Sequence, residues 1–211
     1  MNCDLIAPWY RWFEYLAFGK ALERCRRHYL AEVANARRVL ILGDGDGRFT
    51  AEFLRKNSAA TVDSVDLSPR MLSLAKRRIA GDRLDATRLC LRQGDARTIE
   101  FAGKYDLVVS HFFLDCFTTG ELRTLTARIS AAACLRAQWL VSEFCLPDRG
   151  IQRPAAALLI KAMYLFFRAL TGLRTDSLPD YAPVFEENGF RRVQRASTMG
   201  GLLVSELWDR R

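Results

Sequence analysis

The chain has 211 residues, of which 50% are apolar, and its formal net charge is +8. This length and apolar content suit one globular domain with a sizeable core and exclude a disordered or low-complexity protein. The basic residues are spread over the whole chain, so the charge alone does not indicate a nucleic acid or an anionic membrane as the partner.

The six cysteines are scattered, and none belongs to a C-x-x-C pair. Since His28 and His111 are also far apart in sequence, we expect no zinc or other metal site. Isolated cysteines in apolar surroundings are typical of free thiols in a reducing compartment, so we expect a cytoplasmic protein. Asp4 and Pro8 interrupt any secretory signal core, and no apolar run reaches the ~20 residues of a membrane span.

An aromatic-rich segment near the N-terminus, residues 8–34, has apolar residues at helical spacing. Pro8 suits the first turn of such a helix. Most of this helix is expected to pack on the sheet that follows it. One part could instead act as a lid over a ligand, and Tyr10 is the candidate residue for that role.

Residues 38–50 read RVLILGDGDGRFT and combine three features. The apolar run 39–42 predicts a buried strand, three glycines follow at every second position, and residues 50–57 predict a helix. Glycine allows positive φ and a close approach of the backbone to a ligand. A helix N-terminus offers N–H groups that have no partner within the helix. Together these features predict one half of a nucleotide-binding βαβ unit.

The glycine spacing differs from that of a dinucleotide-binding turn. The turn reads G-x-G-x-G over Gly43, Gly45 and Gly47, whereas the dinucleotide pattern is G-x-G-x-x-G. Asp44 and Asp46 lie inside the turn, where two acids would repel a pyrophosphate and favour a cationic ligand. Taken alone, the turn is equally consistent with a structural strand–helix connection.

The next strand, predicted over 61–68, contains Asp66 near its end. An acid at this position of a nucleotide-binding unit accepts hydrogen bonds from both ribose hydroxyls. A helix over 68–80 follows, and Ser68 already provides its cap, which leaves Asp66 without a structural role that the sequence can identify. Met71 on this helix could pack against an adenine or could simply belong to the core.

The third strand, predicted over 88–97, ends with Gly94, Asp95 and Ala96. Because parallel strands end at one edge of a sheet, these residues would face the same ligand as Asp66. The Asp95 carboxylate could accept a hydrogen bond from an adenine amino group. The backbone N–H of Ala96 could pair with a ring nitrogen.

The fourth strand begins at Tyr105 and is followed by Ser110 and His111. His111 could act as a general base on a hydroxyl, an amine or an acidic carbon, or it could be a hydrogen-bonded residue that shapes the pocket. Asp115 could orient His111. It could equally cap the helix that we expect over 118–135.

The remaining pattern predicts an acceptor-side helix and a closing hairpin. Glu143 lies at the carboxyl end of a strand over 138–147 and faces either the acceptor or solvent. Residues 154–173 predict an amphipathic helix with a wide apolar face. It is a packed helix, the wall of a hydrophobic acceptor pocket, or a helix in peripheral contact with a membrane surface. The last predicted elements are a helix over 179–188 and antiparallel strands over 190–198 and 202–208.

In order and spacing, the glycine turn, Asp66, Gly94–Ala96, the YDLVVS strand and the hairpin resemble class I S-adenosylmethionine-dependent methyltransferases. The chain most resembles the small-molecule branch related to ubiquinone/menaquinone-biosynthesis methyltransferases, over residues 38–208. The resemblance implies an α/β, Rossmann-like seven-stranded sheet, six strands parallel and the last antiparallel, with helices on both faces. It also implies S-adenosyl-L-methionine as the cofactor and in-line transfer of its sulfonium methyl group.

We therefore expect a single methyltransferase domain over 1–211. It would comprise an N-terminal helical cap (1–36), a cofactor-binding core (37–148), and an acceptor-side helix with the C-terminal hairpin (149–211). His111 is the candidate catalytic base. The residues expected to bind the cofactor are Gly43, Asp44, Gly45, Gly47, Asp66, Leu67, Met71, Asp95, Ala96 and Ser110.

One position departs from the family pattern. The family usually has an acid two residues before the first glycine, for the amino end of the cofactor, and this chain has Ile41 there. Either Asp44 or Asp46 replaces that acid, or cofactor binding is weakened. The N/D-P-P-Y/F segment of amino-methylating nucleic-acid enzymes is absent, and Cys116 and Cys145 lie outside the motifs of RNA carbon-5 methylases. A small-molecule acceptor is therefore favoured over nucleic acid. The alternatives are an RNA or protein methyltransferase and a non-catalytic cofactor-binding protein.

Overall fold

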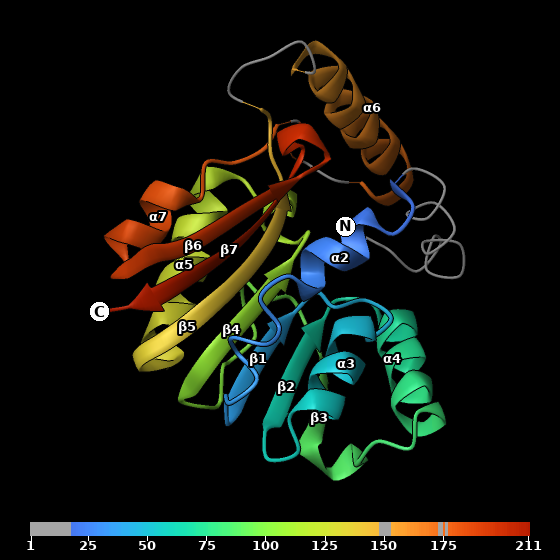
Figure 1. The fold of residues 1–211 in the computed structure, drawn as a ribbon, viewed down its shortest axis with the longest axis vertical. Coiled ribbons are helices and arrows are strands. Elements are labelled where there is room, and N and C mark those ends of the chain that lie inside the picture. Colours follow the sequence, from blue (N-terminus) through green and yellow to red (C-terminus); the bar gives the residue numbers. More distant parts are fainter. Residues whose placement is uncertain (1–17, 148–152, 173–174, 176) are drawn as a thin grey trace.

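The structure is a computed structural model that describes residues 18–147, 153–172, 175 and 177–211. Seven strands form one sheet in the order β3-β2-β1-β4-β5-β7-β6 (Figure 1). β7 runs antiparallel to both of its neighbours, and the other six strands are parallel to one another. This confirms the predicted Rossmann-like sheet. The strands are β1 (Arg38–Leu42), β2 (Thr61–Asp66), β3 (Leu89–Gln93), β4 (Tyr105–His111), β5 (Ala133–Phe144), β6 (Phe190–Thr198) and β7 (Leu203–Arg210).

Helices cover both faces of this sheet (Figure 1). α3 and α4 pack on one face, and α5 and α7 pack on the other. No helix in the described ranges is both long enough and apolar enough to cross a membrane. The described helices are α2 (Ala21–Arg27), α3 (Arg48–Lys56), α4 (Pro69–Gly81), α5 (Thr119–Ala132), α6 (Arg153–Thr171) and α7 (Ala182–Glu187).

The continuous apolar run of β1 is explained by burial on both faces of the sheet. Leu40 and Leu42 belong to the core cluster beneath α5, and Val39 and Ile41 belong to the cluster beneath α3. None of the four side chains is more than 1% exposed. β1 is therefore a central strand that holds the glycine turn rigidly at its carboxyl end.

The helix predicted over 8–34 is wrong in its extent. Within the described residues, α2 ends at Arg27, and the chain continues in turns such as the one closed by Leu30 N–H donating to the Arg27 carbonyl at 3.1 Å. Leu30 and Val33 are buried in the core, so their helix-like spacing reflects anchoring of these turns on the sheet. Tyr10, the candidate lid residue, lies outside the described residues.

β5 starts earlier than predicted, and the helix expected to reach residue 135 ends at Ala132. Ala133 already pairs with Tyr105 of β4, after which the register shifts. Arg136 has a φ of 66° inside this irregular stretch. A bulge interrupts the alternation of side chains along a strand, which is why the sequence pattern failed to reveal the first residues of β5.

α6 lies beyond the carboxyl end of the sheet, next to α2 (Figure 1). Its inner residues Ala156, Ile160 and Tyr164 are buried in a cluster with residues of α2 and the start of β7. Leu158 and Leu165 on its outer side are 70% and 59% exposed. The helix thus closes one end of the molecule while keeping large apolar side chains on the surface.

Candidate functional site

The glycine turn after β1 has an alternating left-handed backbone, as its spacing predicts. φ is 65° at Gly43, 61° at Gly45 and 76° at Gly47. A Cβ on Gly43 would lie 2.5 Å from Cδ2 of Phe113. A Cβ on Gly47 would lie 2.7 Å from the Cβ of Ala75. Both conformation and packing therefore require glycine at these two positions.

Asp44 caps the helix that follows the turn. Its carboxylate accepts hydrogen bonds from the backbone N–H groups of Thr50 at 2.9 Å and Phe49 at 3.3 Å. The N-cap position itself is Gly47, which has no side chain, so Asp44 supplies the cap from inside the turn. Burial raises the pKa of Asp44 to about 6, against the lowering effect of its bonds to Thr50.

Asp46 is held by two arginines. Its carboxylate accepts from Arg48 at 2.9 Å and from Arg78 at 2.7 Å, and Arg78 also donates to its backbone carbonyl at 2.9 Å. The charge of Asp46 is therefore neutralised by neighbouring side chains. Each of the two acids in the turn therefore has a structural partner in the protein.

Asp66 does have a structural role, contrary to the reading of the sequence. Its Oδ2 accepts from the backbone N–H of Gly45 at 3.2 Å, and its Oδ1 accepts from that of Ser68 at 2.8 Å. Asp66 thereby ties the glycine turn to the start of α4. Ser68 is the N-cap of α4, as predicted, and accepts from Met71 N–H at 3.1 Å.

A cavity of about 320 Å³ lies above the glycine turn. Three neighbouring strands, β1, β2 and β3, bring predicted residues to its wall from their carboxyl ends. Leu67 is 42% exposed beside it, whereas Met71 is buried. The predicted residues that line this cavity are Gly43, Asp44, Gly45, Asp66, Leu67, Met71, Asp95, Ala96 and His111.

Asp95 and Ala96 lie where the sequence predicts, but both have partners in the protein. Arg97 donates to both oxygens of Asp95 at 3.0 Å, and this bonding lowers the pKa of Asp95. Arg97 also bonds Glu121 on α5. The carbonyl of Ala96 accepts from Arg128 at 3.0 Å. These contacts fix the loop after β3, while the Asp95 carboxylate still faces the cavity.

His111 lies at the end of β4 and is 5% exposed. Neither of its ring nitrogens has a hydrogen-bond partner among the described residues, and its ring packs edge-on against Phe49 at 4.6 Å. Burial, assisted by the charge of Arg26, holds its pKa well below the ordinary value. The imidazole is therefore neutral, and its lone pair is available to a ligand in the cavity.

Two predicted site residues, Ser110 and Gly47, do not line the cavity. Gly47 packs against Ala75 of α4 beneath the turn. The Ser110 hydroxyl accepts from the indole N–H of Trp139 at 2.9 Å in the core. Its side chain is fully buried and does not line the cavity. Successive residues of a strand point to opposite faces, so Ser110 and His111 cannot both turn to the same ligand.

The acceptor side of the cavity consists of residues that the sequence reading did not single out. The aromatic run after β4 contributes Phe112, which adopts a φ of 52°, and Phe113. α6 contributes Met163, Tyr164 and Phe167. The predicted apolar face of the helix over 154–173 was the one available signal for these residues.

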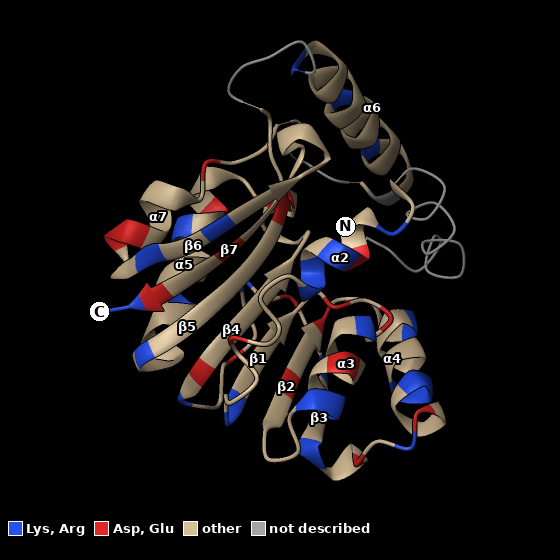
Figure 2. Ribbon diagram, viewed as in Figure 1, with Lys and Arg blue, Asp and Glu red and all other residues tan. Residues whose placement is uncertain are grey.

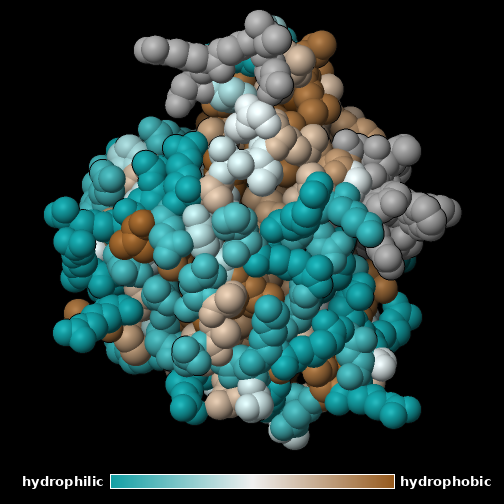
Figure 3. Space-filling view, in the orientation of Figure 1, coloured by the Kyte–Doolittle hydropathy of each residue, from teal (hydrophilic) through white to brown (hydrophobic). Residues whose placement is uncertain are grey.

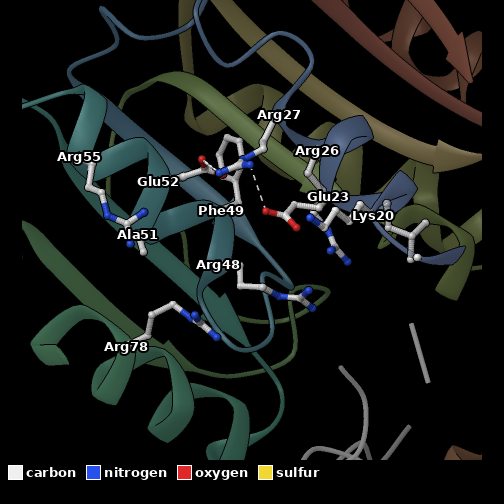
Figure 4. A pocket seen from close by; sticks show the side chains of 12 residues that line it. Lys20, Glu23, Arg26, Arg27, Arg48, Phe49, Ala51, Glu52, Arg55 and Arg78 are labelled. Atoms are coloured by element: carbon white, nitrogen blue, oxygen red, sulfur yellow. Dashed lines mark hydrogen bonds and ion pairs between the residues drawn. The ribbon is translucent and has the colours of Figure 1, made fainter. Parts of the chain in front are cut away.

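A second hollow, of about 310 Å³, lies between α2 and α3 and reaches Arg78 on α4 (Figure 4). These three helices carry several Lys and Arg residues (blue in Figure 2). Ion pairs join Arg27 to Glu52 and Arg55 to Asp82. Partly exposed pairs of this kind stabilise a protein by about 0–1 kcal/mol each. The hollow is lined by Gly19, Lys20, Leu22, Glu23, Arg26, Arg27, Arg48, Phe49, Ala51, Glu52, Arg55 and Arg78.

Comparison with known families agrees with this geometry. Residues 39–134, which include the glycine turn and the strands that line the cavity, match the family model of a methyltransferase domain. Over these residues the chain is similar to a methyltransferase domain. The matched residues end at the start of β5, so the acceptor-side helix α6 and the C-terminal hairpin lie outside the match.

A curated relative of the methyltransferase domain is a malonyl-[acyl-carrier protein] O-methyltransferase from Priestia megaterium (strain DSM 319 / IMG 1521). It is 31% identical over 81 residues, which cover 38% of this chain and 28% of the relative. The similarity is thus confined to a part of both proteins.

Solved structures resemble this chain over most of its length, and the chain spans about 60% of the length of the first two. A putative O-methyltransferase from Nostoc punctiforme has a TM-score of 0.72 and 22% identity, covering 93% of this chain and 60% of that one. An O-methyltransferase family protein from Burkholderia thailandensis has a TM-score of 0.65 and 22% identity, covering 92% and 58%. Magnesium protoporphyrin IX methyltransferase from Synechocystis has a TM-score of 0.66 and 18% identity, covering 91% and 83%. At these identities the likeness establishes the fold.

The raised pKa of Asp44 predicts a specific pH dependence of stability. The folded state holds the Asp44 proton with a pKa of about 6, against 3.8 for the free group. Between roughly pH 4 and pH 6 folding therefore takes up a proton, and stability falls as the pH rises through this window. Asp44→Asn keeps an acceptor oxygen for the N–H groups of α3 but cannot titrate. We expect the Tm of the wild type, relative to Asp44→Asn, to rise by a few degrees between pH 7 and pH 5.

The comparison with Asp44→Asn cancels the other titrating groups. His111, whose pKa is lowered, makes stability rise with pH in its own window, but it is present in both proteins. Thermal unfolding in a pH series measures the difference. Parallel curves for the two proteins would contradict the assignment.

Proposed function

We propose that this protein transfers the methyl group of S-adenosyl-L-methionine to a small-molecule acceptor. The observation that carries the proposal is the convergence of the glycine turn, Asp66 and Asp95 on one cavity at the carboxyl ends of three neighbouring strands. Structures of similar fold with bound S-adenosylhomocysteine, among them the N-methyltransferase NodS from Bradyrhizobium japonicum, support the cofactor.

The residues of the cavity fit this cofactor chemically. Asp66 lines the cavity at the end of β2, where its carboxylate is suited to accept from the ribose hydroxyls. Leu67 and Met71 offer apolar surface for the adenine, and Asp95 offers an acceptor for its amino group. Asp46 is neutralised by arginines, so Asp44 is the acid that would face the amino end of the cofactor in place of the acid missing at position 41.

When bound, the cofactor would supply a methyl group on a positively charged sulfur. A lone pair of the acceptor would form the new bond to this methyl group, and the sulfur would keep the electron pair of the broken bond. His111 can take the proton that a hydroxyl or amine acceptor loses, because its imidazole is neutral and has no hydrogen-bond partner in the described part of the chain. Phe112, Phe144 and Phe167 surround the acceptor side of the cavity with apolar surface. Such surface excludes water and favours a methyl transfer that depends on proximity and alignment.

The role of His111 has a direct test. His111→Ala should lower kcat about 100-fold or more, the usual contribution of a general base, while binding of S-adenosylhomocysteine is retained. His28→Ala is the matched control, because His28 is exposed on the turn after α2. Unchanged turnover in His111→Ala would instead assign this residue to the shape of the pocket.

The acceptor that suits this cavity is apolar. Met163, Tyr164 and Phe167 of α6 line the cavity together with Phe112 and Phe144, and this apolar lining suits a hydrophobic molecule. The name of the Priestia relative supplies a second candidate, an acyl group on a carrier protein. Acceptors of the RNA or protein class are further alternatives, as is cofactor binding without catalysis.

Calorimetry with S-adenosylhomocysteine tests whether the protein binds the proposed cofactor. We expect the wild-type protein to bind it, and absence of binding would refute the proposed function. Transfer of a labelled methyl group to a compound of a cell extract would exclude the non-catalytic alternative. Loss of that transfer after removal of small molecules by dialysis would favour the small-molecule class over RNA and protein acceptors.

We further propose that the protein works in the cytoplasm and that α6 contacts a membrane surface peripherally. The cysteines of the described residues are free thiols, as expected in a reducing compartment. Five of the large exposed apolar residues lie on α6, which also carries Lys161 and Arg168 and no acid (Figure 3). Sedimentation with anionic vesicles that is lost in Leu158→Glu/Leu165→Glu would support the contact. Equal sedimentation of this variant and the wild type would refute it.

A further inference from the structure

Asp115 occupies a fixed position at the acceptor side of the cavity. It lies in the short 3-10 turn Leu114–Cys116 and lines the cavity. Its backbone carbonyl accepts from the hydroxyls of Tyr164 on α6 at 3.2 Å and Thr175 at 3.1 Å. The chain on both sides of the cavity therefore holds the backbone of Asp115 in place.

Neither role that the sequence allows for the Asp115 side chain is realised. α5 is capped by Thr118, which forms a reciprocal capping box with Glu121. The ring nitrogens of His111 have no hydrogen-bond partner among the described residues, so Asp115 does not orient that ring. The carboxylate is consequently not required for either of these structural roles.

The neighbouring side chain that donates to this carboxylate is a weak donor. The Cys116 thiol lies 3.5 Å from Oδ1 of Asp115. Burial raises the pKa of Asp115 to about 6. A desolvated carboxylate whose side-chain donor is a thiol is stabilised when a ligand supplies a stronger donor.

Glu143 fixes the turn that carries Asp115. The Glu143 carboxylate is buried at the end of β5 and accepts from the backbone N–H groups of Phe113 at 2.9 Å and Leu114 at 2.7 Å. Burial, followed by the charge of Asp115, raises the pKa of Glu143 well above its ordinary value. It does not line the cavity and acts on a ligand only through the position of Asp115.

His111 provides a second, independent sign of a ligand at this place. It is 5% exposed, faces the same cavity, and has two ring nitrogens without a partner among the described residues. The Asp115 carboxylate is a hydrogen-bond acceptor, whereas a neutral imidazole has one acceptor nitrogen and one N–H donor. The group that Asp115 would bind must therefore be a donor.

We propose that Asp115 binds the acceptor directly, and that the acceptor presents a hydroxyl or amine to it and not a carboxylate. This inference rests on the proposed methyl transfer and names the class of acceptor. A carboxylate would bring a second negative charge next to Asp115 and would leave its lone pairs without a donor. Of the three described arginines that line the cavity, Arg48 and Arg97 pair with Asp46 and Asp95, and Arg26 lies over the ring of Phe112 at 5.1 Å.

Three probes of the same shape test the inference: 2-naphthol, 2-naphthylamine and 2-naphthoate. Their dissociation constants are measured by ligand-observed NMR on the full chain saturated with S-adenosylhomocysteine. We expect the hydroxyl and amine probes to bind roughly tenfold more tightly than the carboxylate, the factor typical of a hydrogen bond to a charged group. Binding of naphthoate as tightly as naphthol, or binding of none of the probes, would overturn the inference.

Variants of Asp115 separate binding from folding. Asp115→Ala should lose the preference for naphthol, and Asp115→Asn, which keeps an acceptor oxygen, should retain a part of it. Asp85→Asn, at an exposed carboxyl far from the cavity, is the control and should bind as the wild type does. A full preference for naphthol in Asp115→Ala would overturn the inference. Since S-adenosylhomocysteine binding is measured first, failure of the proposed function is recognised before these probes are used.

Discussion

Replacing Asp66 by alanine is expected to weaken the binding of S-adenosylhomocysteine about 100-fold or more, because two hydrogen bonds to a carboxylate are lost together. A variant of Asp66 provides the most direct test of the proposed cofactor. Asp66 is half-buried at the end of β2, it lines the cavity, and its Oδ2 accepts from the backbone N–H of Gly45 in the glycine turn. Calorimetry of the variant and the wild type measures the loss.

The variant also removes the bonds that Asp66 receives from Gly45 and Ser68, so a loosened turn could contribute to the effect. Ser68→Ala tests the contribution of the start of α4. It removes the cap of α4, at a cost of about 1 kcal/mol, and keeps the Asp66 carboxylate with both of its backbone N–H partners. We expect this control to lower the Tm and to keep most of the affinity. An undiminished affinity in Asp66→Ala would remove the cofactor assignment, and an equal loss in Ser68→Ala would assign the effect to the start of α4.

The parts of the site that could be predicted depend on neighbours in the sequence. The buried strand before Gly43 and the left-handed glycines are properties of a few consecutive residues, and the structure has them. The cap of α4 by Ser68 is local in the same way. The seven-stranded sheet with its last strand antiparallel was predicted because the ordered motifs resemble one family, and the observed topology agrees with it.

The parts that could not be predicted depend on contacts between distant residues. Asp46 appeared to be a free acid of the turn, but Arg78 reaches it from α4. Phe113, from the loop after β4, fills the space that a side chain on Gly43 would occupy. Glu143 supports that loop from the end of β5. Such contacts between distant residues leave no periodic pattern in the sequence. The negative charge of the turn was therefore overestimated, and most residues on the acceptor side of the cavity were not predicted.

Gly47→Ala is expected to destabilise the protein by about 3 kcal/mol or more, since it combines backbone strain with a steric clash. The φ of Gly47 is 76°, where a non-glycine residue is unfavourable. The added Cβ would lie 2.9 Å from Cα of Ala75, which is backbone in α4 and cannot rotate away. α4 would have to move, together with Met71 on the cavity wall. Denaturant unfolding measures the loss of stability.

Gly120→Ala is the control for this prediction. Gly120 lies in the first turn of α5, its φ is not positive, and a Cβ there would meet no atom within 4 Å. Alanine is the better helix former by up to ~1 kcal/mol, so this variant should be as stable as the wild type or slightly more stable. A Gly47→Ala protein that unfolds at the denaturant concentration of the wild type would mean that α4 adjusts to the turn. The close packing of Ala75 on Gly47 would then not determine the conformation of the glycine turn.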